Sequence, residues 1–188
     1  MRFRKKRIDT FILKSRFEKH EIIKDNLIKL IKQADGENVV TKNDDYHNDN
    51  ITKTDFCFAD DLERPWVKEL MKEFTNVFGE FCDEMSMLEM KLNKIWYQLY
   101  EKDSFHNWHT HASNYSGIYY LNLPEGSAKT QFVDTNKMDI YEINAKEGDV
   151  IFFPCYLIHR GAPQLIDDTK VIVSWNLDFT KIKLQDLG

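Results

Sequence analysis

The chain of 188 residues is long enough for one domain with a substantial core, and its composition, 42% hydrophobic and 30% charged, is that of a globular protein. A net charge of −5 excludes a broad basic surface for nucleic acid, and no apolar segment is long enough to span a bilayer or to form the centre of a secretion signal. Three widely separated cysteines without a CxxC pair exclude a disulfide framework and a zinc knuckle, so we expect a soluble, cytoplasmic protein without a membrane partner.

The first segment of the chain is basic and then takes on a helical pattern. The stretch RFRKKR, Arg2–Arg7, is most simply a solvated terminus, with an arm that binds nucleic acid as the alternative. Ser15 followed three residues later by Glu18 has the form of a capping box, which predicts the start of a helix. Apolar residues at helical spacing follow as far as Ile31, so we expect one amphipathic helix in this segment.

A second helix is predicted after a polar stretch. Residues 36–58 are polar and irregular, which predicts mostly loop with room for one short strand. Pro65 suits the first position of a helix, and apolar side chains recur behind it at steps of three and four as far as Met85. Such a stripe is typical of a helix that packs against a sheet.

From Lys91 onward the apolar pattern has a period of two, which is the period of β-strands. The strand-like segments are KIWYQLY, SGIYYLNL, KTQFVD, DIYEIN, DVIFFP and VIVSWNLDF, and no helical pattern interrupts them. We therefore expect a mainly β fold, a cupin-like jelly roll with the N-terminal α-helices packed outside. In this organisation residues 1–90 form a helical and irregular support region, residues 91–188 form the core, and the two make one compact domain.

Three of the six histidines fall within six positions, in the stretch FHNWHTHASNYSGIYYLN that begins at Phe105. Because alternate residues of an extended backbone share a face, His109 and His111 are expected to point the same way and His106 is expected to point elsewhere. The remaining candidates for a third ligand from another strand are His20, His47 and His159. We interpret the pair as part of a metal site, and the alternative is two polar side chains that face solvent.

His159 stands out because it follows the apolar segment GDVIFFPCYLI, late enough to lie beside the first pair. Three ligands on one side of a metal leave other positions open, which suits non-haem iron that binds both a cosubstrate and dioxygen. Lys170 begins the apolar segment KVIVSWN, where a lysine costs free energy unless its ammonium group meets water or an anion. An anionic cosubstrate on the metal would supply that partner.

With these residues the sequence resembles a known family, the prolyl-hydroxylase-like 2-oxoglutarate/Fe(II)-dependent dioxygenases. The resemblance covers about residues 91–179, and more weakly TDFCFADDLERPW upstream. The stretches that carry it, in the family's order, are WYQLYEKDSFHNWHTH, SGIYYLN, GDVIFFPCYLIH and KVIVSWN. The sequence is most similar to the small oxygenases of bacteria and tailed phages that share a W-H-x-H…S-G-x-Y-Y signature. This resemblance implies a double-stranded β-helix, and a phage-encoded protein of a bacterial host as one source.

The resemblance also implies which residues hold the metal. His109 and His159 stand where the family has its two metal histidines, and His111 stands where most members have a carboxylate ligand. The implied ligands of Fe(II) are therefore His109, His111 and His159, with His106 or a water molecule as the alternative to His111. A neutral imidazole in place of a carboxylate leaves the metal centre one charge unit more positive, which strengthens its hold on dianionic 2-oxoglutarate and alters its redox behaviour.

Three further residues are implied to bind the cosubstrate. Lys170 aligns with the basic residue that binds the far carboxylate of 2-oxoglutarate. Tyr120 matches a tyrosine whose hydroxyl helps to hold that carboxylate, and Tyr100 matches one that lines the pocket; core packing is the alternative for both. The implied function is a 2-oxoglutarate- and Fe(II)-dependent dioxygenase that consumes O2, releases succinate and CO2, and hydroxylates a substrate. The sequence specifies neither the oligomeric state nor the substrate, be it a protein side chain such as proline, a nucleobase or a small molecule.

Two other functions stay open at this point. Cupin-type oxygenases and isomerases use three-histidine metal sites without 2-oxoglutarate, and they need no basic residue such as Lys170 opposite the metal. A non-catalytic jelly-roll binding module would carry its histidines incidentally and would bind no metal tightly.

Overall fold

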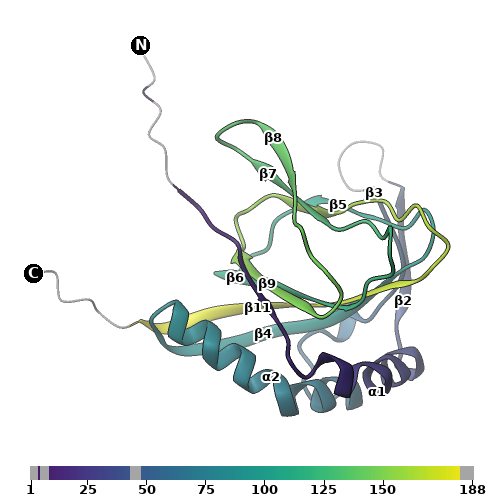
Figure 1. Ribbon diagram of the computed structural model, residues 1–188, viewed down its shortest axis with the longest axis horizontal. Coiled ribbons are helices and arrows are strands. Elements are labelled where there is room, and N and C mark those ends of the chain that lie inside the picture. Colours follow the sequence, from purple (N-terminus) through teal and green to yellow (C-terminus); the bar gives the residue numbers. More distant parts are fainter. Residues whose placement is uncertain (1–3, 5–8, 43–47, 183–188) are drawn as a thin grey trace, which may run out of the picture.

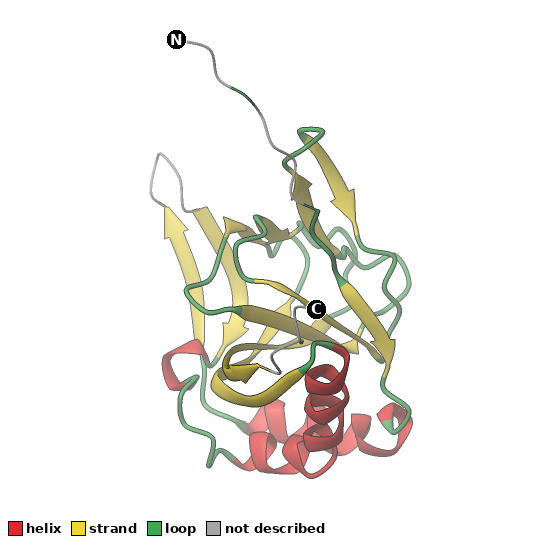
Figure 2. Ribbon diagram, turned by 90° about the vertical axis from the view of Figure 1, so that its left-hand side faces the viewer, coloured by secondary structure: helices red, strands yellow, loops and turns green. Residues whose placement is uncertain are grey.

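The computed structural model describes residues 4, 9–42 and 48–182, and over these residues it shows two facing β-sheets with two helices outside (Figures 1 and 2). The larger sheet has the strand order β1 (Leu13–Arg16), β9 (Asp149–Pro154), β6 (Tyr115–Asn122), β11 (Lys170–Ile182), β4 (Met87–Tyr100), β3 (Asn48–Thr54) and β2 (Glu37–Lys42). The smaller sheet has the order β5 (His106–His109), β10 (His159–Gly161), β7 (Thr130–Asp134) and β8 (Asp139–Glu142). All the paired strands in these residues are antiparallel, as expected for a jelly roll.

The two helices, α1 (His20–Gln33) and α2 (Pro65–Glu84), cover one face of the larger sheet, and the smaller sheet lies over its other face (Figure 1). Pro65 is the first residue of α2, as predicted. The buried face of α2 consists of Trp66, Val67, Leu70, Phe74, Phe78 and Phe81. No helix in the described residues is long and apolar enough to cross a membrane.

The strands of the larger sheet are sandwiched, so successive side chains enter two different cores. On β11, Val171 and Val173 pack with the helices, whereas Ile172 between them belongs to a second cluster inside the barrel. On β4, Tyr97 faces the helices and Tyr100 faces the barrel interior. This alternation explains why both faces of these strands are apolar, and it reserves every second position for the interior of the barrel.

The N-terminal part of the chain contains more strand than predicted. Ser15 lies in β1, where it pairs with Val150 of β9, and α1 begins only at His20 without a side-chain cap, so the predicted capping box is wrong. The stretch predicted as mostly loop forms β2 and β3 at one edge of the larger sheet. Edge strands carry few apolar side chains, here mainly Val39 and Ile51, and this explains why the polar pattern resembled a loop. Apart from Arg4, the basic stretch Arg2–Arg7 lies outside the described residues.

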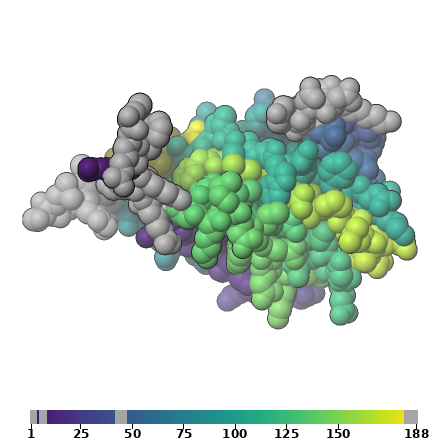
Figure 3. Space-filling model, turned by 90° about the horizontal axis from the view of Figure 1, so that it is seen from above, coloured from purple at the N-terminus to yellow at the C-terminus, as the bar shows by residue number. Residues whose placement is uncertain are grey.

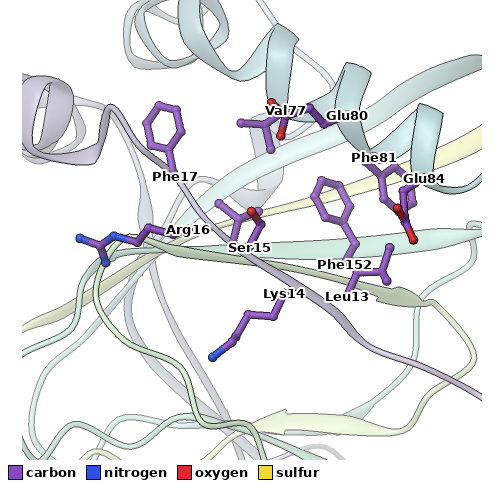
Figure 4. A pocket seen from close by; sticks show the side chains of 11 residues that line it. Leu13, Lys14, Ser15, Arg16, Phe17, Val77, Glu80, Phe81, Glu84 and Phe152 are labelled. Atoms are coloured by element: carbon purple, nitrogen blue, oxygen red, sulfur yellow. The ribbon is translucent and has the colours of Figure 1, made fainter.

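The β1 strand also shapes a hollow of about 340 Å³ beside α2. Its apolar wall includes Leu13, Phe81 and Phe152, and the carboxylates of Glu80 and Glu84 stand at its border (Figure 4). Phe81 and Phe152 belong to the core between the helices and the sheet, so this hollow lies on the helix side of the sheet, whereas the barrel interior lies on the other side.

Asp55 joins the start of α2 to the larger sheet. Its buried carboxylate accepts hydrogen bonds from the indole N–H of Trp66 at 2.9 Å, from the backbone N–H of Tyr97 at 2.9 Å and from the guanidinium of Arg64. Arg64 in turn donates to the backbone carbonyl of Ile95 on β4. Since the side chains of Asp55 and Arg64 are only 1% and 10% exposed, each depends on the other for its charge partner.

We expect Asp55→Ala to lower the free energy of unfolding by about 3–5 kcal/mol, because the Arg64 guanidinium would be left buried without its counter-ion. Urea denaturation followed by circular dichroism measures the change. Asp60→Ala, at an exposed neighbouring position, is the control and should change stability by no more than about 0.5 kcal/mol. Equal effects of the two substitutions would contradict the structural role of Asp55.

Candidate metal centre

Three histidines converge in a pocket of the barrel. His109 ends β5 and His159 begins β10, and the two residues are directly paired across these strands. His111 lies in the loop after β5, where its backbone N–H donates to the carbonyl of Cys155 at 3.2 Å. One ring nitrogen of each histidine lies within 4.8 Å of the others, and the Nε2 atoms of His111 and His159 are 3.2 Å apart. The predicted set of three is therefore brought together.

Backbone carbonyls fix the orientation of two of these rings. The Nδ1 atom of His109 lies 2.6 Å from the carbonyl oxygen of Asn107, and the Nδ1 atom of His159 lies 2.8 Å from that of Leu157. Because a carbonyl oxygen can only accept, each Nδ1 carries the proton, and a neutral ring then presents the lone pair of Nε2. Such outer contacts are typical of histidines that bind a metal.

The electrostatics of the cluster favour neutral rings. Burial and, to a smaller extent, the neighbouring His109 together lower the pKa of His111 to about 3. Burial also lowers the pKa of His159 well below its usual value, again with a contribution from His109 and His111. Neutral imidazole is the form that binds a metal. A divalent ion about 2.1 Å from each nitrogen would place adjacent nitrogens about 3 Å apart, close to the 3.2 Å between His111 and His159 Nε2, and all three nitrogens lie within 4.8 Å of one another, so the residues fit a metal ion.

His106 is not a member of the converging set, but it does not point away from it as predicted. Its ring stacks on that of His109 with centroids 3.8 Å apart and an angle of 21° between the planes. Four residues of β5, His106 to His109, lie opposite the three residues 159–161 of β10. This β-bulge shifts the alternation of side chains along β5. Its Nδ1 atom lies 3.2 Å from the Nε2 amide nitrogen of Gln98, which orients the ring.

The other two candidates for a third ligand have different outcomes. His20 is fully buried between α1 and the larger sheet, where its Nδ1 lies 2.6 Å from the hydroxyl of Tyr119 and its Nε2 lies 3.4 Å from Glu147. These contacts attach α1 to the sheet on the side away from the barrel. His47 lies outside the described residues.

Lys170 is buried against the inward-facing ring of Tyr100. It is only 2% exposed, its Nζ donates to the backbone carbonyl of Ala128 at 2.9 Å, and it lies 4.2 Å from the centre of the Tyr100 ring. Among the described residues no carboxylate forms an ion pair with it. Burial accordingly lowers the pKa of Lys170 to about 7, with only a small opposing effect of Glu142.

The two predicted tyrosines occupy different positions around this lysine. Tyr100 pairs with Lys170 across β4 and β11 and lines the same pocket as the histidines. Tyr120 is buried next to the pocket, and its hydroxyl donates to Thr130 Oγ1 at 2.9 Å. Thr130 itself lines the pocket, so Tyr120 orients a pocket hydroxyl.

Several pocket residues escaped the sequence analysis. The pocket at the histidines is also lined by Trp96, Gln98, Ser116, Ile118, Thr130, Ile172 and Ser174. Most occupy the alternate, inward positions of β4, β6 and β11, which is the signal that could have identified them. The small polar members, Ser116 and Ser174, donate their hydroxyls to the carbonyl of Trp175 at 2.9 Å and to the side chain of Gln98 at 3.4 Å.

No protein-family model and no curated protein matches the sequence, but solved structures do match the fold. An oxidoreductase of the 2OG-Fe(II) oxygenase family from Burkholderia pseudomallei aligns with a TM-score of 0.69 and 15% identity, over 92% of this chain and 86% of that one. A prolyl-4-hydroxylase from Pseudomonas putida aligns with a TM-score of 0.62 and 9% identity, over 88% and 91%. HygX from Streptomyces hygroscopicus, with nickel and 2-oxoglutarate bound, aligns with a TM-score of 0.65 and 11% identity, over 91% and 84%. The predicted double-stranded β-helix is thereby confirmed.

We expect His159→Ala to weaken the binding of Mn(II) by more than about 100-fold, and His111→Ala to weaken it comparably, because each removes one of the converging nitrogens. Isothermal titration calorimetry on the pure protein measures the affinity. His106→Ala is the matched control, since it removes a stacked ring that is outside the converging set, and it should cost no more than about tenfold. If His106→Ala were the most harmful of the three, the assignment of His111 would be wrong.

Proposed function

We propose that this protein is a 2-oxoglutarate- and Fe(II)-dependent dioxygenase that hydroxylates a substrate. The observation that carries this proposal is the presence, inside one barrel, of three converging histidines and a buried lysine that has no carboxylate partner among the described residues. The shared fold with solved 2-oxoglutarate oxygenases supports it. The first feature is what a metal needs, and the second is what the carboxylate of an anionic cosubstrate needs.

In this proposal Fe(II) is held by His109, His111 and His159. Imidazole nitrogen is a suitable ligand for iron, and three protein ligands leave room for a chelating cosubstrate and for dioxygen. Three neutral ligands also leave the full double positive charge on the metal. That charge favours a dianion such as 2-oxoglutarate as the next ligand.

Lys170 would bind the far carboxylate of the cosubstrate. Among the described residues this ammonium group donates to Ala128 alone, so it retains further N–H groups for a ligand, and the Tyr100 ring restrains its position. The hydroxyl of Thr130, which is oriented by Tyr120, lies on the same pocket wall. A carboxylate in this place would meet a point charge and a hydroxyl donor in surroundings of low polarity, where both interactions are strong.

Bound iron and 2-oxoglutarate would supply the oxidising chemistry, in which O2 converts 2-oxoglutarate to succinate and CO2 and one oxygen atom enters the substrate. The chain itself has to position the reactants and keep water out. Ile118 and Ile172 contribute apolar wall to the pocket, and the carbonyls of Asn107 and Leu157 hold two of the imidazoles in place. The residues that line the pocket are compatible with more than one class of substrate.

A three-histidine oxygenase or isomerase that does not use 2-oxoglutarate is the second candidate, because His111 stands where most members of the resembled family have a carboxylate. Lys170 separates the two functions. Such an enzyme has no need of a buried cation beside a residue that lines its pocket, and this is why we favour the 2-oxoglutarate-dependent reaction.

The protein incubated anaerobically with Fe(II) and 2-oxoglutarate should develop a visible metal-to-ligand charge-transfer band, and admission of oxygen should produce succinate even without a substrate. Absorption spectroscopy and chromatographic analysis of succinate measure the two events. His159→Ala should lose both, because the metal is no longer held. A wild-type protein that binds Fe(II) tightly but shows neither the band nor succinate would support the three-histidine alternative.

Binding of 2-oxoglutarate should take up a proton at Lys170. At pH 8 this lysine, with a pKa of about 7, is mostly neutral in the free protein, and a bound carboxylate raises its pKa so that about one proton is taken up. At pH 6 the lysine is already charged and uptake should approach zero, so affinity should fall as the pH rises above 7. Calorimetry on the Mn(II)-loaded protein in buffers of different ionisation enthalpy measures the uptake without turnover.

Two variants at this position provide the controls. Lys170→Arg keeps a permanent charge, so it should bind 2-oxoglutarate with no proton uptake between pH 6 and 8. Lys170→Met should weaken 2-oxoglutarate binding far more than Mn(II) binding. Equal losses of both ligands in Lys170→Met, or unchanged proton uptake in Lys170→Arg, would show that Lys170 does not contact the cosubstrate.

A further inference from the structure

The backbone of β5 is irregular at Asn107 and Trp108, which together lie opposite the single residue Arg160 of β10. A bulge of this kind takes backbone groups out of the ladder of hydrogen bonds between strands. Within the described chain β5 is also the edge strand of the smaller sheet. The N–H groups of the two bulge residues therefore need other acceptors, and each of them donates to a side-chain oxygen.

Asp49 of β3 supplies the first of these oxygens, because its Oδ1 atom accepts the backbone N–H of Asn107 at 2.8 Å. The Asp49 side chain is only 19% exposed, and its own backbone N–H donates to Thr41 Oγ1 at 2.8 Å. The next residue, Asn50, exchanges two backbone hydrogen bonds with Phe105. Figure 1 shows β3 beside β5, and in Figure 3 the blue atoms at this edge of the larger sheet adjoin teal atoms of the barrel. The carboxylate thus joins the larger sheet to the bulge.

Asn107 supplies the second oxygen. Its Oδ1 atom accepts the backbone N–H of Trp108 at 2.8 Å, and its backbone carbonyl accepts the Nδ1 proton of His109 at 2.6 Å. Both contacts involve the same peptide group, the one that joins residues 107 and 108. The orientation of this peptide group therefore decides whether Nδ1 of His109 keeps its acceptor.

The bulge is restrained from β10 as well. The guanidinium carbon of Arg160 lies 4.5 Å from the centre of the Trp108 ring, and its Nε donates to Gln131 Oε1 at 2.8 Å. This stacking holds the Trp108 end of the bulge, whereas the hydrogen bond to Asp49 holds the Asn107 end.

We propose that Asp49 is a positioning residue of the metal centre and that it acts on His109 through the β5 bulge. By holding Asn107, the Asp49 carboxylate keeps the Asn107 carbonyl on Nδ1 of His109, and Nε2 then carries the lone pair for a metal. The proposal rests on the metal site of the proposed function. It adds a residue of the polar stretch that the sequence pattern had indicated to be mostly loop.

Asp49 also lies near a second histidine. Its Oδ2 atom is 3.9 Å from Nε2 of His106, which is too far for a hydrogen bond, and the His106 ring stacks on that of His109. The negative charge of Asp49, felt through His106, is therefore the alternative cause of an effect on the metal. The experiments have to separate this charge from the hydrogen bond to Asn107.

Long-range ¹H–¹⁵N NMR spectra of the metal-free, ¹⁵N-histidine-labelled full-length protein at pH 8 show which nitrogen of each ring carries the proton. His109 should be protonated at Nδ1 in the wild type. Asp49→Ala should shift His109 towards the Nε2–H form, which neutral histidine prefers in water. His159 is the internal control and should keep its tautomer, because the Leu157 carbonyl holds its Nδ1. An unchanged His109 tautomer in Asp49→Ala would overturn the proposal.

Calorimetric titration with Mn(II) measures the consequence for metal binding. Asp49→Ala should weaken binding by at least about tenfold, whereas Asp49→Asn, whose amide oxygen still accepts from Asn107, should stay within about fivefold of the wild type. Asp134→Ala is the matched control and should bind as the wild type does, since Asp134 likewise accepts a backbone N–H, that of Asn136 at 2.9 Å, but in the turn after β7. Equal losses in Asp49→Ala and Asp49→Asn would assign the effect to the charge and overturn the proposal.

A double variant tests the route through the bulge. Asp49→Ala should still cost about tenfold in Mn(II) affinity when His106→Ala is already present, because the bulge does not depend on the His106 ring. Disappearance of the loss in that background would show that Asp49 acts through His106. A wild-type protein that binds no Mn(II) would contradict the proposed function itself, whereas tight binding by both wild type and Asp49→Ala would contradict the role of Asp49 alone.

Discussion

The larger sheet is covered on both faces, and the rest of the structure depends on this constraint. Its central strands β4, β6 and β11 send successive side chains into two different environments, the core beneath the helices and the interior of the barrel. A polar residue at an inward position therefore cannot reach solvent by a small backbone adjustment, since a shift of one residue would exchange the two faces. Gln98 is fixed in the barrel by Tyr97 and Leu99 on either side of it, and Lys170 is fixed there by Val171, which packs with the helices.

The metal-binding geometry depends on departures from regular strand structure. His111 lies two residues beyond the end of β5, so its position is set by the hydrogen bond to Cys155 and by the loop that follows. That loop is anchored in turn, because the carboxylate of Asp178 on β11 accepts the backbone N–H of Asn114 at 2.7 Å. The bulge in β5 brings His106 against His109. The regular strands form the barrel, and the irregular backbone of the β5 bulge and the following loop orients the histidine side chains.

Sequence patterns predicted those elements whose local sequence signal agrees with the burial of the same residues in the fold. Pro65 and the apolar stripe behind it predicted α2, and alternation placed His109 and His111 on one face. The grouping of His159 and Lys170 with them came from family resemblance more than from periodicity. Ser15 was assigned to a helix because its local pattern matched a cap, but pairing with β9 decides its conformation. His106 was misplaced because a bulge leaves no trace in residue spacing.

Burial of the Lys170 charge affects the stability of the fold and also favours binding of an anionic ligand. Its pKa is lowered from 10.5 to about 7, so the folded protein binds fewer protons than the unfolded chain between these pH values. Burial of the charged form is therefore unfavourable below pH 7, and the penalty disappears as the pH rises towards 10.5. At about 1.4 kcal/mol per pKa unit this penalty is a substantial fraction of the stability of a domain. A leucine or methionine at this position of β11 would avoid it, whereas a dicarboxylate bound between Lys170 and the histidines would supply the missing counter-ion.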